Sequence, residues 1–509
     1  MRRERLKAVA REEIGPYTLL RVERGGLDPG APGQFFMLEA PGRLLPRPMS
    51  LCFAPRGELA FLIDPIGPGT RAICTLEPGD ELQVLGPLGN GFRLELGRPL
   101  LVGGGIGIAP LPYLSEALGR PPAVLGFRSD WHAQAAELVP NAQTCVEPTL
   151  VTQLIPDGMD VLPAGPSRCS RQSGRSRPTR SSHGRRRWPA ATAPATAAPS
   201  RSAASSSASA SKDRCSVLLN ASGCLDALTA PDVARALDAF VTKTVTPLPR
   251  DGNTPVRIAE TDVGMLNSIG LANPGIDRFV TRNLPPLGEL GVPVWVSVGG
   301  FETDDYAEIC SRLDDHAEVS AIELNVSCPN VEAPAESAAQ IVAASRLATR
   351  KPLWAKLSPA VPDIAEVARA AQAAGADGIS LVNTIRGLKL SARTLRPVLG
   401  PGQGGLSGPA LKPIALAAVA NCYRATQLPI VGMGGVQSGL DALELIAAGA
   451  RHVALGTVLF ADPDAPARVR AELHAAAAER GWRAYEDAYA VAHEEALSVG
   501  TTLDHKSSV

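Results

Sequence analysis

The sequence lacks several features that mark particular classes of protein. Its 509 residues contain no apolar run near the roughly 20 residues that span a bilayer, so we expect no membrane segment. Residues 1–14 are charged rather than apolar, which predicts no secretory signal. The formal net charge is only −1, so no global field favours nucleic acid or an anionic membrane. The nine cysteines are scattered without a CxxC pair, which indicates a reducing cytoplasm.

A chain of this length exceeds what one hydrophobic core usually supports, so two or three domains are expected. Hydrophobic residues make up 45% and charged residues 20%, which permits a large buried core. Residues 1–95 carry short β-rich runs separated by Gly/Pro turns, a pattern typical of a small β-barrel. These runs are Tyr17–Val22, Gln34–Leu38, Leu59–Ile63 and Glu81–Leu85.

The pattern changes over residues 96–166. The apolar strand Pro99–Val102 leads directly into the glycine-rich turn GGGIGIAP (Gly103–Pro110) and the helix-like stretch Leu111–Leu118. A strand, a glycine turn and a helix in this order begin a nucleotide-binding α/β unit, so we interpret this segment as a partial dinucleotide-binding domain.

From 217 to 509, apolar strands alternate with Ala-rich helical stretches. This rhythm over roughly 290 residues predicts a single (β/α)8 barrel. Most of the strands end in polar or glycine residues, and in such barrels the C-terminal strand ends build the active site. The strands expected are Val294–Gly300, Ala321–Ser327, Leu353–Leu357, Gly378–Asn383, Pro429–Gly435 and His452–Thr457.

Residues 167–216 have a very different composition. They contain ten Arg, one Lys, a single acidic residue (Asp213) and long Ser/Ala/Pro tracts, which cannot bury a core. A disordered basic linker is one interpretation, and a nucleic-acid-binding tail is a second. A third interpretation, a shifted reading frame, is argued below.

The segment Glu323–Asn330 (ELNVSCPN) is the richest in chemistry, because it places Cys328 at the end of a strand between Asn325 and Asn330. A cysteine at a strand end is about as often a packing residue as a reactive one. The flanking amides, however, are the groups needed to hold a planar polar ring. Loops with Lys243-Thr244, Asn267–Leu271 and Asn383-Thr384 could complete a site for a small, anionic, amide-rich substrate.

Glycine-rich segments indicate phosphate binding at the late strand ends. Backbone N–H groups without side chains can close on phosphate oxygens, and late barrel loops are the usual place. The segments are Gly404–Gly408, Gly432–Gly435 and Gly456-Thr457. Lys356, on its own strand, would place a cation beside a flavin ring, although a structural ion pair is the alternative.

These motifs resemble the class 1 dihydroorotate dehydrogenases, and among them the NAD-linked subclass. The resemblance rests on ASGC (221–224), KT (243–244), NSIGLANPG (267–275), ELNVSCPN, LVNT (381–384) and GGLSGPALKP (404–413). It implies FMN as cofactor, dihydroorotate as substrate in pyrimidine (UMP) biosynthesis, a homodimer through the barrel, and a heterotetramer for the family. It also implies that Cys328 removes the C5 proton while hydride passes from C6 to FMN. A thiol suits this role because its environment can bring its pKa close to working pH.

The resemblance carries two further sets of residues onto this chain. The implied substrate contacts are Lys243, Asn267, Ser268, Ile269, Gly270, Leu271, Asn325, Asn383 and Thr384. The implied FMN contacts are Ser222, Lys243, Thr244, Asn325, Lys356, Gly408, Gly434, Gly435, Gly456 and Thr457. Ser297 stands where relatives often carry Asn, which weakens one flavin contact.

Residues 1–166 resemble the electron-transfer subunit of the same NAD-linked enzymes, which carries FAD, a [2Fe–2S] cluster and an NAD site. RPMSLC (47–52) resembles the RPxS flavin motif of ferredoxin-reductase-like proteins, and GPLGNGF (86–92) extends the match. The implied FAD contacts are Arg47, Pro48, Met49, Ser50, Gly69 and Thr70. The implied NAD contacts are Gly103, Gly104, Gly105 and Gly107.

One departure from that subunit is large, because the four cluster cysteines expected after the nucleotide domain are missing. Reading residues 167–216 in a shifted frame restores them at Ala190, Ala195, Ala198 and Ala210. Their spacing, C-x4-C-x2-C with a distant fourth cysteine, is that of a plant-type [2Fe–2S] site. The chain would then be two adjacent reading frames joined by frameshifts. As written it binds no metal there, because alanine cannot ligate iron.

Two alternatives come from other classes. The first is the pyrimidine-reducing barrel of dihydropyrimidine dehydrogenase, against which the missing multi-cysteine segments argue. The second makes residues 1–216 a non-catalytic docking module with a basic tail, and assaying that fragment for bound FAD would discriminate.

Overall fold

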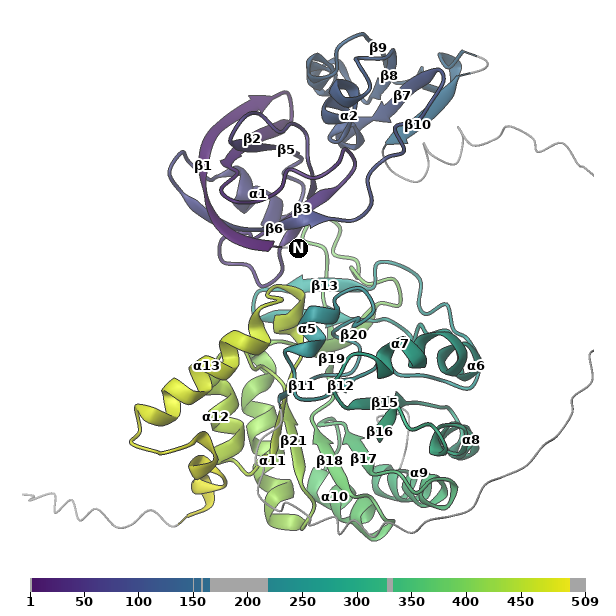
Figure 1. Ribbon diagram of the computed structural model, residues 1–509, viewed down its shortest axis with the longest axis vertical. Helices are drawn as coiled ribbons and strands as arrows, with labels where there is room; N and C mark the ends of the chain where they lie inside the picture. The colour runs from purple at the N-terminus through teal and green to yellow at the C-terminus, as the bar shows by residue number, and fades with distance from the viewer. Residues whose placement is uncertain (1, 150, 157–158, 165–217, 327–332, 495–509) are drawn as a thin grey trace, which may run out of the picture. The chain divides into compact units, whose positions relative to one another are not determined.

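The computed structural model describes residues 2–149, 151–156, 159–164, 218–326 and 333–494. The chain divides into two compact units, Met1–Asp213 and Arg214–Val509, and each is described by itself. Figure 1 labels their helices and strands.

The first unit begins with a six-stranded antiparallel barrel in the strand order β4-β3-β6-β1-β2-β5. The segment after β4 closes it, since Phe53 forms an antiparallel bridge to Ala60 on β5. Phe36 and Phe61 meet edge to face in its core, with ring centroids 5.7 Å apart. The expected β-barrel is therefore confirmed. Its elements are β1 (Arg2–Ile14), β2 (Tyr17–Glu23), β3 (Phe35–Leu38), β4 (Arg47–Ser50), β5 (Glu58–Ile63), α1 (Pro68–Cys74) and β6 (Glu81–Leu88).

Strand β1 is absent from the prediction, because its sequence is mostly charged. Only Leu6 and Ala8 on β1 are buried, while its charged side chains lie at or near the surface. Only two of the thirteen residues are buried, and the three consecutive apolar residues Ala8–Ala10 break the alternation that would reveal a strand.

A parallel four-stranded sheet follows, in the order β10-β7-β8-β9. The predicted strand, glycine turn and helix are all present in it. A Cβ on Gly103 would lie 2.7 Å from Leu111 Cδ1, so glycine is needed there for the helix to pack on the strand. The elements are β7 (Pro99–Gly104), η1 (Gly105–Ile108), α2 (Leu111–Ala117), β8 (Ala123–Phe127), α3 (Asp130–Ala133), η2 (Gln134–Leu138), β9 (Ala142–Val146), η3 (Val151–Gln153) and β10 (Asp160–Ala164).

The second unit is a barrel of eight parallel strands, as expected. The strand order is β11-β22-β21-β18-β17-β16-β15-β12, and a parallel bridge between Leu219 and Ala239 closes the ring. The strands are β11 (Leu218–Asn220), β12 (Phe240–Val241), β15 (Val294–Val298), β16 (Val319–Asn325), β17 (Leu353–Leu357), β18 (Gly378–Leu381), β21 (Ile430–Met433) and β22 (His452–Leu455).

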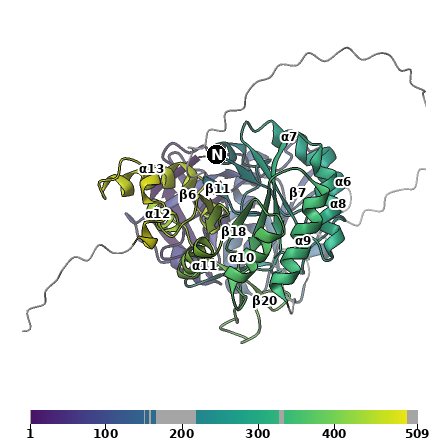
Figure 2. The same ribbon diagram turned by 90° about the horizontal axis from the view of Figure 1, so that it is seen from below.

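Helices surround the barrel strands on the outside (Figures 1 and 2). They are α5 (Pro231–Arg235), α6 (Ile276–Arg278), α7 (Leu284–Gly288), α8 (Thr303–Asp314), α9 (Pro334–Ala348), α10 (Ile364–Ala373), α11 (Lys412–Ala425), α12 (Gly439–Ala447) and α13 (Ala465–Ala478). Short turns of other helix types are η4 (Phe279–Asn283), η5 (Pro409–Leu411), η6 (Thr457–Phe460), η7 (Tyr485–Ala488) and η8 (Val491–His493). In the described ranges, no helix is both long and apolar enough to cross a membrane.

Side chains alternate between the two faces of the barrel wall, as strand geometry requires. On β16, Ile322 and Leu324 belong to the large core shared with the helices, whereas Ala321 belongs to a separate cluster with Trp354. Trp295 and Trp354 pack with ring centroids 4.8 Å apart. The barrel interior is therefore a packed core beneath the site rather than a pore.

A second, antiparallel sheet of four short strands lies at the C-terminal ends of the barrel strands and was not predicted. Its order is β13-β14-β20-β19, and its strands are β13 (Ile258–Thr261), β14 (Gly264–Asn267), β19 (Ile385–Leu388) and β20 (Gln403–Ser407). Gly404 and Gly405 thus lie within a strand, not in a loop at a barrel strand end as the sequence suggested. The absence of a side chain at Gly405 lets β20 pack closely against Thr384, because a Cβ on Gly405 would overlap Thr384 Oγ1.

Candidate active site

A cavity of about 890 Å³ opens where the barrel strands end. Segments that follow β11, β12, β16, β17, β18, β21 and β22 all contribute to its wall, and β14 and β20 of the antiparallel sheet contribute as well. Because parallel strands all point the same way, their C-terminal ends meet on one face and bring together residues far apart in sequence.

The structure brings the substrate and FMN positions implied by the resemblance to this one cavity. Cys328 lies outside the described residues. The residues that line the cavity include Ser222, Lys243, Thr244, Asn267, Ser268, Ile269, Gly270, Leu271, Asn325, Lys356, Asn383, Thr384, Gly408, Gly434, Gly435, Gly456 and Thr457. Ser297 is fully buried and bonds to Thr244, with Oγ···Oγ1 at 3.1 Å, but does not line the cavity.

Two lysines bring positive charge to the cavity, of which Lys356 is buried and Lys243 is half-buried. Lys356 Nζ lies 3.4 Å from Glu323 Oε1, and the side chains are only 8% and 2% exposed. Burial lowers the pKa of Lys243; the nearby Cys224 opposes this shift and the Lys356 ammonium adds to it. Burial also raises the pKa of the Cys224 thiol, so this cysteine stays protonated.

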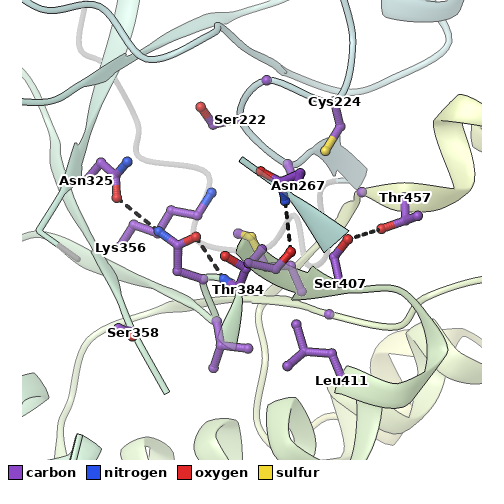
Figure 3. Close-up of a pocket in the computed structure, with 18 of the residues that line it drawn as sticks. Ser222, Cys224, Asn267, Asn325, Lys356, Ser358, Thr384, Ser407, Leu411 and Thr457 are labelled. Carbon is purple, nitrogen blue, oxygen red and sulfur yellow. Dashed lines mark hydrogen bonds between the residues drawn. The ribbon is translucent and has the colours of Figure 1, made fainter. Parts of the chain in front are cut away.

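Hydrogen bonds hold the side-chain amides of the cavity wall in place, and Figure 3 labels two of them, Asn267 and Asn325. Asn383 Nδ2 donates to Asn325 Oδ1 at 3.0 Å, and its own Oδ1 accepts from the Thr384 backbone N–H at 2.8 Å. Asn267 Nδ2 donates to the Gly405 carbonyl at 3.2 Å, which ties strand β14 to β20. These amides are positioned before any ligand binds, which lowers the entropy cost of binding.

The loop that follows β14 is held by contacts from the preceding segment. Asn253 Nδ2 donates to Ser268 Oγ at 2.9 Å, and Arg250 Nε donates to the Gly270 carbonyl at 3.3 Å. Gly270 and Leu271 both adopt positive φ, of 73° and 55°. A non-glycine residue at positive φ is uncommon, so the surrounding hydrogen bonds must hold Leu271 in this turn.

Glycines form another part of the cavity wall. Gly434 and Gly435 have φ of 121° and 84°, and a Cβ on Gly435 would lie 2.8 Å from the Lys412 backbone nitrogen. Gly408 also has positive φ, at 94°, and precedes the turn into α11. Thr457 Oγ1 donates to Ser407 Oγ at 2.9 Å, which joins the segment after β22 to β20 (Figure 3). Backbone amides without side chains in this arrangement form a cradle suited to a phosphate group.

Sequence reasoning missed several residues of this cavity. Cys224, Met265, Arg386 and Ser407 line it, but none had been assigned a role. Glu323 was not predicted as a site residue, although an acidic residue inside the mostly buried strand Val319–Asn325 is itself a signal of a buried partner. Arg386 lies on β19, two residues after the predicted site residue Thr384, and the fold shows that it lines the cavity as well.

The first unit brings two of its implied motifs together. Arg47 on β4 lies against the first turn of α1, since a Cβ on Gly69 would overlap the Arg47 guanidinium. Pro48, Met49 and Ser50 complete β4, and Thr70 lies in the same turn as Gly69. Gly103 and Gly104 end β7, while Gly105 and Gly107 lie in η1. Ala190, Ala195, Ala198 and Ala210 lie outside the described residues.

Comparison with known proteins assigns the second unit. The family model described as "Dihydroorotate dehydrogenase" matches residues 207–476. The chain belongs to the dihydroorotate dehydrogenase family. The family match assigns nothing to residues 1–206.

Curated relatives in the family are similar over most of their own length. The "Dihydroorotate dehydrogenase B (NAD(+)), catalytic subunit" of Desulforudis audaxviator is 46% identical over 265 residues, which is 50% of this chain and 86% of the relative. The same-named protein of Trichlorobacter lovleyi is 46% identical over 252 residues, 48% of this chain and 83% of the relative. The "Putative dihydroorotate dehydrogenase A (fumarate)" of Solibacter usitatus is also 46% identical, over 47% of this chain and 81% of the relative.

Proposed function

We propose that the barrel unit oxidises dihydroorotate to orotate in pyrimidine biosynthesis, with FMN bound in the cavity at the C-terminal strand ends. Dihydroorotate dehydrogenation is the activity of the family to which the chain belongs. The observation that carries the proposal is the convergence of the implied substrate and FMN positions in the described ranges on one cavity of about 890 Å³.

The residues present fit FMN. Gly408, Gly434, Gly435 and the Gly456-Thr457 pair form a cradle of the kind that holds a phosphate group. Lys356 supplies a cation at the base of the cavity, where it would stabilise negative charge on a reduced flavin ring. When bound, FMN would supply the hydride acceptor.

The charge of the cavity favours an anionic substrate over a neutral pyrimidine. Lys243 and Lys356 bring two ammonium groups, and Glu323 offsets one of them. Dihydroorotate carries a carboxylate that can pair with Lys243, while Asn267, Asn325 and Asn383 can bond to its ring amides. Dihydrouracil has no carboxylate, so this charge argues against the dihydropyrimidine dehydrogenase alternative.

Cys328 is the proposed base that removes the C5 proton. It follows Asn325 by three residues, and three residues of chain span at most about 11 Å. Asn325 itself lines the cavity, so its position supports placing the thiol within reach of the substrate. Asn325 and Asn383 would hold the substrate ring while the thiol takes the proton.

Anaerobic titration of the purified chain tests this function. We expect bound FMN, identified after release by chromatography, and full bleaching of its absorbance by dihydroorotate. Dihydrouracil serves as the matched substrate without a carboxylate and should leave the flavin oxidised. Bleaching by dihydrouracil but not by dihydroorotate would favour the alternative function, and the absence of any flavin would refute FMN binding.

For the first unit we propose FAD and NAD as ligands, in the cytoplasm. The contact of Arg47 with Gly69, and the strand-turn-helix at Gly103–Gly107, support this proposal. NAD as the electron acceptor is part of this proposal. Relatives of equal identity carry both NAD(+) and fumarate in their names. We also propose a homodimer through the barrel, the heterotetramer of the family, and a frameshift within residues 167–216. A docking module without FAD is the alternative for this unit, and flavin analysis of the isolated fragment distinguishes the two.

A further inference from the structure

Glu323 lies in the barrel interior, where a carboxylate is costly. The residue is 1% exposed, and it stands on β16 between Ile322 and Leu324, which face the helix layer. An unpaired carboxylate in such a place costs several kcal/mol, and even a buried ion pair is often no more stable than apolar side chains of the same size. Stability alone therefore gives no reason for an acidic residue at this position.

The partner of Glu323 is Lys356 on the neighbouring strand. The strand register places Lys356 opposite Asn325, so Glu323 lies two residues deeper in the barrel than the position facing Lys356. Lys356 nevertheless directs its ammonium towards Glu323, with Nζ 3.4 Å from Oε1. Glu323 does not line the cavity, whereas Lys356 does. The carboxylate thus acts on the cavity through the lysine.

The pair also sets the charge at the base of the cavity. Lys243 and Lys356 would together bring two positive charges into a site where Cys224 remains neutral. Glu323 offsets one of these charges, which leaves the Lys243 ammonium, beside the more exposed Arg386 that also lines the cavity, for a bound anion. Interactions between charges are stronger in a buried site than in water, so a single buried carboxylate has a measurable effect there.

We propose that Glu323 is a positioning residue that anchors the Lys356 ammonium at the cavity base and offsets its charge, thereby setting how readily a flavin bound there is reduced. This inference rests on the proposed binding of FMN. It goes beyond that function by assigning a role to a residue that touches neither substrate nor cofactor.

The reduction equilibrium of bound FMN in the full-length Glu323→Gln protein tests the proposal. Wild-type and variant protein are compared at the same pH. Reduction adds negative charge to the flavin, and the substitution removes a nearby negative charge. We expect the ratio of reduced to oxidised FMN at a fixed solution potential to rise about tenfold, or about 30 mV for a two-electron couple. An unchanged ratio in protein that retains FMN would overturn the proposal.

A second arm shows whether Glu323 acts through Lys356. In a Lys356→Met background there is no ammonium for Glu323 to anchor or to offset. We therefore expect Glu323→Gln to change the ratio less than twofold there. An equal shift in both backgrounds would mean that Glu323 acts as an independent charge, and it would refute the positioning role.

A matched control is Asp462→Asn. Asp462 is also buried and pairs with Arg468 at 2.8 Å, but it does not line the cavity. The Asp462→Asn substitution should lower the thermal unfolding temperature without changing the ratio of reduced to oxidised FMN.

If Glu323→Gln does not fold, Glu323→Asp replaces it as the test variant. This substitution keeps the charge but lengthens the separation from Lys356, so a smaller shift of the FMN ratio in the same direction is expected. A wild-type protein without FMN would instead contradict the proposed function.

Discussion

The side chain of Asn220 takes the place of a neighbouring strand for Val241. Its Nδ2 donates to the Val241 carbonyl at 2.7 Å, and its Oδ1 accepts from the Val241 N–H at 2.8 Å. Asn220 lies at the end of β11 and Val241 at the end of β12, the two strands whose pairing closes the barrel through a single backbone bridge. The amide thus completes the ring beside the active site.

We therefore expect Asn220→Leu to destabilise the barrel unit by about 2–4 kcal/mol, because both backbone groups of Val241 lose their buried partner. Chemical unfolding followed by flavin fluorescence measures the change. Asn421→Ala on α11 is the control, since Asn421 is exposed and should alter stability by less than about 0.5 kcal/mol. Equal effects of the two substitutions would show that the Asn220 bridge contributes nothing to closure.

Cys328→Ala should leave FMN bound but slow dihydroorotate oxidation near neutral pH by about 10²–10⁴-fold, since a positioned base is lost. Steady-state assays with a dye acceptor, together with flavin content, measure both properties. Cys422→Ala is the matched control, because Cys422 is buried in α11 away from the cavity. Wild-type turnover by Cys328→Ala would show that the thiol is not the base.

We expect substrate binding to weaken at alkaline pH, where Lys243 loses its positive charge. Burial lowers its pKa from the ordinary value of 10.5, so the ammonium is lost at a lower pH than that of a free lysine. KM for dihydroorotate should rise in the alkaline range, at pH values below that of a free lysine. Lys243→Met should raise KM about tenfold to a hundredfold and remove this pH dependence. Lys351→Met, which changes a lysine outside the cavity, should keep the wild-type profile. An identical profile in Lys243→Met would rule out this lysine as the titrating group.

Purified protein should show flavin absorbance without the broad red bands of a [2Fe–2S] cluster. The four positions at which the shifted frame places cysteine hold Ala190, Ala195, Ala198 and Ala210, and a methyl group cannot ligate iron. Iron and labile-sulfide analysis measures the cluster directly. Stoichiometric iron in protein of this sequence would refute the frameshift account.

Electron transfer to NAD should consequently be poor or absent. The relay that stands between FAD and FMN in the family is missing, whereas a dye that reaches FMN directly should still be reduced. Assays with NAD and with a dye compare this chain with a repaired pair, in which the frame of residues 167–216 is restored and the two polypeptides are separate. Equal NAD reduction by both would identify residues 167–216 as a working connector.

Much of the architecture could be predicted because it is encoded locally. The strands Ile430–Met433 and Pro99–Gly104 are continuous runs without a charged residue, which is the pattern of a strand covered on both faces. The antiparallel sheet over the cavity escaped prediction because β20 reads QGGLS, and glycine has low strand propensity. Its glycines are required by contacts with Thr384 and Asn267, which lie far away in the sequence.

The chemistry of the candidate site depends on residue types in short motifs, and such motifs can be recognised in the sequence alone. An amide, a lysine or a glycine pair keeps its hydrogen-bonding capacity wherever it stands, so the fold class and the family followed from the chain. Cys224, Met265, Arg386 and Ser407 join the cavity wall only through the fold. Pairings depend instead on three-dimensional distance. The ion pair of Glu323 with Lys356, the amide pair of Asn325 with Asn383 and the closure by Asn220 join residues 33, 58 and 21 positions apart. Burial within the barrel removes water from these groups, and it is this desolvation, absent from any linear pattern, that makes each pairing strong enough to shape the site.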